Sequence, residues 1–209
     1  QYRLAAKRQG EKTDSGLSIG LLTLWNDKVL RTLSIALLIL AAVYLPIETV
    51  VLPTYFEHID NPSGLGLVIS ALAAGSAVGA FGYGWISTRI QKKILVRSIL
   101  IGSALSIIPM AFLPPLPSLM TAGFFLGLSW GPYNPLMTTL VQQRVPAHLH
   151  GQVFGVQTAV FYAAPPLGMV LTGLSVESYG VNLTYVFLAV TLSVTSILVL
   201  LTKSLRSNF

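Results

Sequence analysis

Six long apolar segments, separated by short polar stretches, dominate this chain of 209 residues. They occupy residues 33–56, 65–88, 98–113, 118–141, 153–176 and 183–202. A helix that crosses a bilayer needs about 20 predominantly apolar residues, and a backbone in lipid must satisfy its hydrogen bonds within helices or a closed barrel. Only 10% of the residues are charged, compared with about 25% in a typical soluble domain. The sequence therefore predicts an all-α membrane protein with six transmembrane helices.

Positive residues are confined to alternate connections between these segments. All 13 Lys and Arg residues lie before the first segment, in connections 89–97 and 142–152, or after the sixth segment. The other three connections have none and contain Glu57, Asp60 and Glu177. Because Lys and Arg mark cytoplasmic loops, we predict a protein of the cell inner membrane with both ends of this chain cytoplasmic. A net charge of +6 would suggest nucleic acid in a soluble protein, but here the topology explains it and no nucleic-acid partner is predicted.

The first 31 residues differ from the rest because they are polar and basic. Their one apolar cluster, at 17–25, is too short to span a bilayer. We predict a short helix lying along the membrane surface with Trp25 at the level of the headgroups, and a disordered tail is the alternative. The chain then divides into a cytoplasmic connector (1–31) and a six-span bundle (32–209).

Glu48 is the only full charge inside an apolar segment. An ionisable group in hydrocarbon is costly, so it indicates a functional site. Tyr44 and Tyr55 share its helix face, and Pro46 and Pro53 flank it and interrupt the backbone hydrogen bonding. We predict that Glu48 exchanges a proton or pairs with a cationic substrate. The alternative is a carboxylate that reaches the outer surface.

Small residues and prolines mark where the helices pack and break. Gly75 and Gly79 in the second segment, and 123, 127 and 131 in the fourth, form glycine stripes at helical spacing. Such stripes allow close approach of membrane helices. Gly131–Pro132 is expected to break the fourth segment and Pro165–Pro166 the fifth.

A second group of residues has the composition of a ligand-cavity wall. Its members are aromatic or carry hydrogen-bonding groups, and two sets of them share helix faces: Trp130, Asn134 and Thr138 in the fourth segment, and Gln157 and Phe161 in the fifth, with Tyr44 from the first. Small-molecule pockets are mostly apolar with a few polar groups. The alternative is ordinary aromatic packing with interhelical amide hydrogen bonds.

Nothing in the sequence indicates an enzyme, a cofactor or a metal site. The chain has no cysteine, no phosphate-binding G-x-x-x-x-G-K, no H-E-x-x-H and no G-x-S-x-G. His148 and His150 lack the further ligands that a metal site needs.

Several motifs in order resemble the C-terminal half of a major facilitator superfamily transporter. Residues 84–93 are similar to the superfamily's loop motif, with Gly84, Arg89, Lys92 and Lys93 at its glycine and basic positions. They depart from it at Thr88, where an acid is usual, and at Gln91, where a glycine is usual. Other motifs of the superfamily have counterparts in the same order. The connector before the seventh span resembles residues 15–33, the end of the tenth span resembles 131–135, the loop that follows it resembles 142–153, and the antiporter motif resembles 165–168. Within the superfamily, the chain most resembles the proton-driven exporters of drugs, macrolides and enterobactin.

This resemblance implies a twelve-helix protein with two six-helix halves around a cavity, each half an inverted pair of three-helix repeats. It implies a secondary transporter that exports amphiphilic drugs or siderophore-like molecules in exchange for protons, by alternating access. The expected partners are the small-molecule substrate, the proton gradient, the lipid bilayer and the N-terminal half. Two alternatives remain: a scaffold or regulatory half that does not transport, and a six-helix channel.

Overall fold

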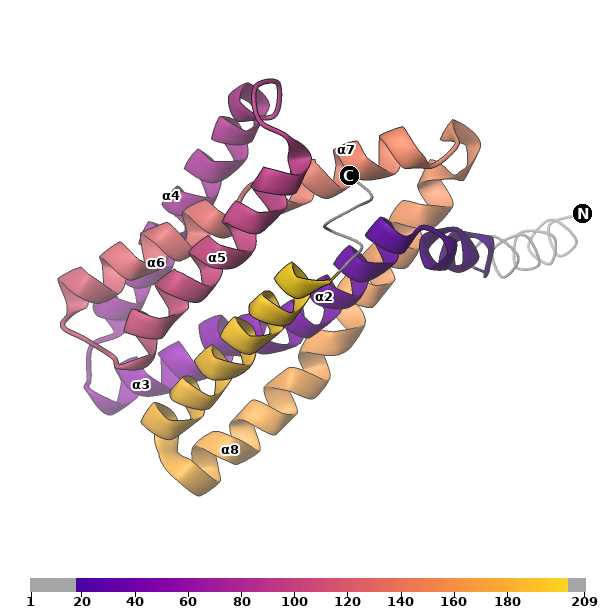
Figure 1. Cartoon of the computed structure of the whole chain (residues 1–209). Coiled ribbons are helices and arrows are strands. Elements are labelled where there is room, and N and C mark those ends of the chain that lie inside the picture. Colours follow the sequence, from indigo (N-terminus) through magenta and orange to yellow (C-terminus); the bar gives the residue numbers. More distant parts are fainter. Residues whose placement is uncertain (1–17, 203–209) are drawn as a thin grey trace, which may run out of the picture.

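The computed structural model describes residues 18–202, and within them every regular element is a helix (Figure 1). A helical stretch at 18–26 comes first. The elements that follow are α2 (Lys28–Pro46), the π-helical segment η1 (Ile47–Val51), α3 (Leu52–His58), α4 (Pro62–Ile86), α5 (Lys92–Ala111), α6 (Leu116–Trp130), α7 (Tyr133–Arg144), the 3-10 turn η2 (Ala147–Leu149) and α8 (His150–Leu201). The all-α prediction is confirmed. The part of the connector at 1–17 and the basic residues Lys203 and Arg206 lie outside the described residues.

Four helical stretches in the described residues are long and apolar enough to cross a membrane: Lys28–His58, Pro62–Ile86, Lys92–Ala111 and Ala147–Leu201. The last has 55 residues and bends sharply at Gly180, where φ is 79°. This left-handed conformation suits glycine, which has no Cβ to clash. Figure 1 shows α8 turning back on itself, so that its second limb (181–201, yellow) runs beside the first.

Prolines interrupt the helices at one of the two predicted places. The fourth apolar segment is broken at Gly131–Pro132 into α6 and α7, as predicted. The predicted break at Pro165–Pro166 is wrong, because α8 continues through both residues. Proline fixes φ near the helical value, and membrane helices tolerate the lost hydrogen bonds where neighbouring helices and local adjustments satisfy the freed carbonyl groups.

The helices pack as two groups, α4 with α6 and α2 with α8, and α5 contacts both α6 and α8 (Figure 1). Glycines on α4 and α6 allow these two helices to approach backbone to backbone. An added Cβ would meet a carbonyl oxygen of the facing helix at each of four positions: Gly75 against Phe124, Gly79 against Leu128, Gly127 against Leu72, and Gly131 against Ser76. The predicted packing role of the stripes is confirmed at these positions, whereas Gly123 has only ordinary contacts from 3.7 Å.

The contact between α2 and α8 has the same character and explains one of the prolines. Pro46 has no N–H to donate to the carbonyl of Ala42, four residues earlier. That carbonyl oxygen lies directly against Gly168 of α8, where a Cβ would collide with it. The missing hydrogen bond on α2 therefore coincides with a point where the two helix backbones are in close contact.

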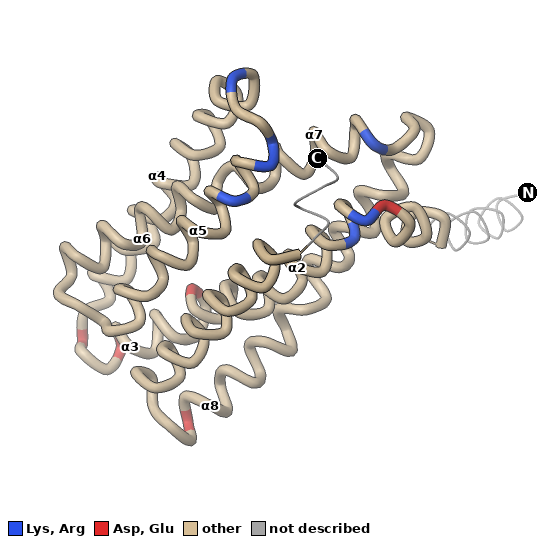
Figure 2. Tube along the Cα trace, in the orientation of Figure 1, with Lys and Arg blue, Asp and Glu red and all other residues tan. Residues whose placement is uncertain are grey.

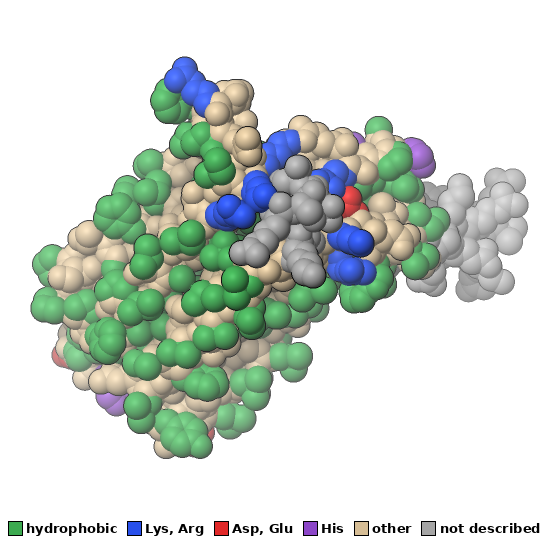
Figure 3. Space-filling view, viewed as in Figure 1, with side chains coloured by type: hydrophobic (Ala, Val, Ile, Leu, Met, Phe, Trp, Pro, Cys, Tyr) green, Lys and Arg blue, Asp and Glu red, His purple; other side chains and the backbone are tan. Residues whose placement is uncertain are grey.

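Charge is separated along the long axis of the molecule. Figure 2 shows the Lys and Arg residues at one end and most of the Asp and Glu residues toward the other. Between these ends, Figure 3 shows hydrophobic side chains over most of the visible face. Phe81 and Phe112 are 85% and 74% exposed. An apolar belt between two polar ends fits a bilayer better than water.

Candidate functional site

Three aromatic rings form a continuous stack where α6 ends. Trp130 stacks on Tyr44 of α2 with a centroid distance of 5.1 Å and an angle of 19° between the ring planes. Its other neighbour is Tyr133 of α7, at 5.5 Å and 12°. The Tyr133 hydroxyl group donates to the carbonyl oxygen of Leu33 at 3.4 Å. The break at Gly131–Pro132 thus places two aromatic side chains against α2.

A pocket of about 330 Å³ lies beside this stack. Its walls come from α2, α7 and the first limb of α8, and the residues that line it are Leu37, Tyr133, Asn134, Met137, Thr138, Phe154, Gln157, Thr158, Phe161 and Tyr162. Four of the predicted cavity residues, Asn134, Thr138, Gln157 and Phe161, are therefore brought together. Tyr44 and Trp130 do not line the pocket but adjoin it through Tyr133.

Gln157 is the most unusual side chain in this pocket. It is only 9% exposed, and within the described residues its amide nitrogen has no hydrogen-bond partner. A buried amide N–H group without a partner costs roughly 1–3 kcal/mol. Asn134 and Thr138, across the pocket, are exposed and leave one side of it open. The arrangement offers a ligand an unused donor on an otherwise largely apolar wall.

Glu48 lies apart from this pocket, in η1. It is half-buried, and the structure shows no hydrogen bond or ion pair for its carboxylate within residues 18–202. It comes 11 positions after Leu37, the α2 residue that lines the pocket, or about 16 Å along a helix. Tyr44 lies between the two sites. The predicted site residue Tyr55 packs edge-on against Phe56 and belongs to neither site.

The backbone around Glu48 is irregular, as the flanking prolines predict. The N–H of Leu52 donates to the carbonyl of Ile47, five residues earlier, which is the π-helical pattern. Pro46 and Pro53 bound this segment. Short π-helical insertions occur frequently at functional sites, and this one carries the only acidic residue in the middle of α2–α3.

At the basic end of the bundle, an ion pair joins a carboxylate oxygen of Asp27 to a guanidinium nitrogen of Arg144, 3.1 Å apart. Asp27 also caps α2 by accepting from the N–H groups of Val29 and Leu30, at 2.8 and 2.9 Å. Burial opposes ionisation of this carboxyl group, but the hydrogen bonds and the Arg144 charge prevail and lower its pKa. The contact ties the start of α2 to the end of α7.

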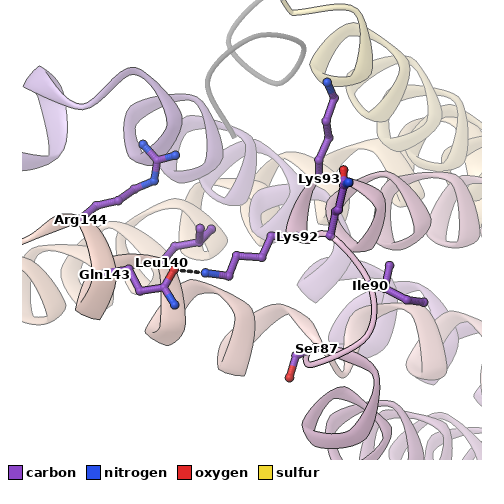
Figure 4. Close-up of a pocket in the computed structure, with 8 residues that line it drawn as sticks. Ser87, Ile90, Lys92, Lys93, Leu140, Gln143 and Arg144 are labelled. Atoms are coloured by element: carbon purple, nitrogen blue, oxygen red, sulfur yellow. Dashed lines mark hydrogen bonds between the residues drawn. The ribbon is translucent and has the colours of Figure 1, made fainter.

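The loop motif between α4 and α5 contributes to a basic pocket of about 440 Å³ (Figure 4). Lys92 and Lys93 line it together with Arg144, and Lys92 donates to the side-chain oxygen of Gln143. Arg89 instead lies over the ring of Trp85, 4.3 Å from its centroid. Gly84 is exposed, and an added Cβ there would meet nothing within 4 Å, so no contact requires glycine at this position.

Comparison with known proteins identifies the family. A model described as Major Facilitator Superfamily matches residues 32–207. The chain belongs to the Major Facilitator Superfamily. This membership agrees with the all-helical fold and with the apolar belt of the described residues.

Its relatives within the superfamily include named exporters. The multidrug efflux pump Tap of Mycobacterium tuberculosis is 37% identical over 92% of this chain and 46% of its own length. Tap of Mycolicibacterium fortuitum is 34% identical over 92% of this chain and 47% of its own. The macrolide efflux protein A of Streptococcus pyogenes is 23% identical over 78% and 41%. The chain thus spans less than half the length of each of these relatives, and the resemblance to a superfamily drug exporter is confirmed.

Two residues of this superfamily member were missed by the sequence analysis. Tyr133 belongs to both the stack and the pocket. Its position directly after the Gly131–Pro132 break could have indicated a role, because helix breaks at membrane depth border protein or a cavity. Asp27 links two helices, and its position just before an apolar helix is typical of an N-cap.

Proposed function

We propose that this chain is the C-terminal six-span half of a proton-coupled efflux transporter for amphiphilic small molecules. The spans are α2 to α3, α4, α5, α6 with α7, and the two limbs of α8 (150–179 and 181–201). Two facts support this count: α6 and α7 are each shorter than the roughly 20 residues of a span, and α8 reverses at Gly180. The basic end of the bundle lies on the cytoplasmic side of the inner membrane, and the 18–26 helix lies along the membrane surface. The pattern of Lys and Arg residues supports this orientation.

The pocket beside the aromatic stack carries the functional proposal. An apolar wall with a few hydrogen-bonding groups is typical of small-molecule sites. Asn134, Thr138 and Gln157 supply the polar groups, and Phe161 and the Tyr133 ring supply the apolar surface. A drug-sized amphiphile would bury its apolar part there and accept a hydrogen bond from Gln157. The names of the Tap relatives support export as the direction.

Glu48 is the proposed site of proton exchange, or of pairing with a cationic substrate. Ionisable side chains inside membrane segments are rare and are most often functional. The lack of a described partner for Glu48 supports a carboxylate that changes its protonation during transport. Its separation from the pocket makes it a coupling residue and not a pocket wall.

Alternating access requires this half to move against another. The backbone-to-backbone contacts between α4 and α6, and between α2 and α8, support movement as one body. The partner would be an N-terminal six-helix half, since this chain covers less than half the length of its relatives.

The experiment measures export of a fluorescent lipophilic cation from cells that express the full protein. We expect Gln157→Ala to change the preference among cations of different shape, with little change in protein abundance. Glu48→Gln is expected to abolish export that depends on the proton gradient while the protein stays in the membrane. The matched control is Gln152→Ala, at a half-buried glutamine of α8 that does not line the pocket. If both glutamine variants lower abundance equally and leave the preference unchanged, the pocket serves only packing.

A further inference from the structure

The basic pocket of Figure 4 has no role in the proposed transport cycle. It lies where the loop after α4, the first turn of α5 and the end of α7 meet. Lys92, Lys93 and Arg144 supply positive charge, and Gln143 and Ser87 supply neutral polar groups. Figure 4 shows Lys92 reaching across to Gln143 on α7. Three cationic side chains from two helices therefore line one hollow.

Two of the cationic side chains of this pocket contact neighbouring polar groups. Arg144 pairs with Asp27, which faces it from the start of α2. Lys92 donates to a neutral carboxamide, and this contact leaves the lysine charge in place. Arg144 is also near enough to Lys92 for the two like charges to interact. The pocket brings three cationic side chains close together, and a bound anion would be attracted to them.

An apolar crevice adjoins the basic pocket at Ile90, which lines both. It has a volume of about 400 Å³ and lies between α4, α5 and α6. Ile86, Ile94 and Leu95 line it, and Gly82 widens it, since an added Cβ there would meet only a side-chain carbon at 4.0 Å. Ile94 is 48% exposed, so the crevice opens to the outside of the bundle.

The two hollows together have the shape and polarity of one amphiphile. A hydrated anion would use only the basic pocket and would leave the crevice empty. A phospholipid uses both, with a phosphate beside the lysines and an acyl chain along the helices. Trp85 is 64% exposed and lies under Arg89 at the same end of α4, an arrangement typical of the membrane interface. Basic pockets between membrane helices at that level bind anionic headgroups.

We propose that this chain binds an anionic phospholipid, with its phosphate on Lys92, Lys93 and Arg144 and an acyl chain in the crevice between α4, α5 and α6. The lipid would fix the loop after α4 to the end of α7. The inference requires a membrane protein and does not depend on transport.

The test is native mass spectrometry of the full protein in detergent, titrated with phosphatidylglycerol or with phosphatidylcholine of the same acyl chains. Each lysine near a headgroup contributes about fivefold to affinity, so Lys92→Gln/Lys93→Gln is expected to weaken phosphatidylglycerol binding by about thirtyfold. Phosphatidylcholine binding should hardly change. The matched control, Lys28→Gln/Arg31→Gln, removes two positive charges near the same end but outside the pocket, and should retain the preference.

A second variant tests the crevice independently of charge. Gly82→Leu places a side chain in the crevice, and leucine is compatible with a helix. The variant is expected to weaken phosphatidylglycerol binding by about tenfold, because the new side chain excludes several methylene groups of the acyl chain from the crevice. Equal losses in the pocket and control double variants would overturn the proposal in favour of general surface attraction. Displacement of the lipid by millimolar inorganic phosphate, with no effect of Gly82→Leu, would identify a site for free anions instead.

Discussion

Substitution of Gly127 by alanine tests how closely α4 and α6 approach. The new Cβ would collide with the Leu72 carbonyl oxygen and lie 2.9 Å from both the Leu72 carbonyl carbon and the Ser76 amide nitrogen. All three atoms belong to the backbone, so they cannot move aside independently of the helix. To bring the 2.9 Å contacts to the ordinary contact distance of 3.4 Å, the helices must separate by at least 0.5 Å. Overpacking of this kind costs about 1–3 kcal/mol.

A matched variant removes the effect of helix propensity. Alanine favours a helix over glycine by about 1 kcal/mol wherever it is placed. Gly173→Ala, in α8, gains this term without any clash, because its Cβ would meet nothing within 4 Å. The difference between the two variants then isolates the packing cost. At the middle value of about 2 kcal/mol, their Tm values should differ by about 4–8 °C.

The assay is thermal unfolding of both purified variants in the same detergent, followed by intrinsic fluorescence. Gly127→Ala should unfold at the lower temperature, and Gly173→Ala at or above the temperature of the unmodified protein. Equal Tm values for the two variants would refute the close backbone contact between α4 and α6.

Substitutions at three further residues test other parts of the structure. Asp27→Ala removes both a helix cap and an ion pair and should cost about 1–2 kcal/mol, whereas Asp27→Asn keeps the cap and should cost under about 1 kcal/mol, measured by thermal unfolding at neutral pH. Because folding lowers the pKa of Asp27 below its ordinary value of 3.8, its contribution is complete above that pH and is lost as the pH falls further, so the Tm difference between Asp27→Asn and the unmodified protein should shrink in acid. A Tm difference that stays constant with pH would exclude the ion pair with Arg144 as the cause of the Asp27 contribution. Trp130→Ala opens the aromatic stack and should cost about 3–5 kcal/mol, while Trp130→Phe should recover most of that stability. Glu48→Gln should abolish export that depends on the proton gradient without lowering Tm, and a lower Tm with normal export would indicate a structural carboxylate.

Much of this fold follows from local sequence patterns, and the exceptions have physical causes. Apolar length located the four helical stretches that are long and apolar enough to cross a membrane, and glycine spacing located the close contact between α4 and α6. Proline was a poor guide in α8, since Pro165–Pro166 continues the helix whereas Gly180 reverses it. A proline breaks a membrane helix only when its surroundings fail to satisfy the freed carbonyl groups, and those surroundings are not visible in local sequence.

The candidate site was predicted in part for a similar reason. Helical spacing placed Asn134 with Thr138, and Gln157 with Phe161, on shared faces that the fold brings to one pocket. Spacing could not pair Tyr44 with Trp130, or separate Glu48 from the pocket, because these relations depend on packing between distant helices. The ion pair between Asp27 and Arg144 joins residues 117 positions apart, and no local pattern predicts such a partner.

Counterflow tests the proposal of a carrier most directly. The full protein is reconstituted in liposomes loaded with an unlabelled lipophilic cation, and uptake of the labelled cation from outside is measured without a proton gradient. We predict transient accumulation above equilibrium, and a change in its cation preference with Gln157→Ala. Uptake that never exceeds equilibrium would indicate a channel, and uptake equal to that of protein-free liposomes would indicate a half that does not transport. Either result would contradict the account.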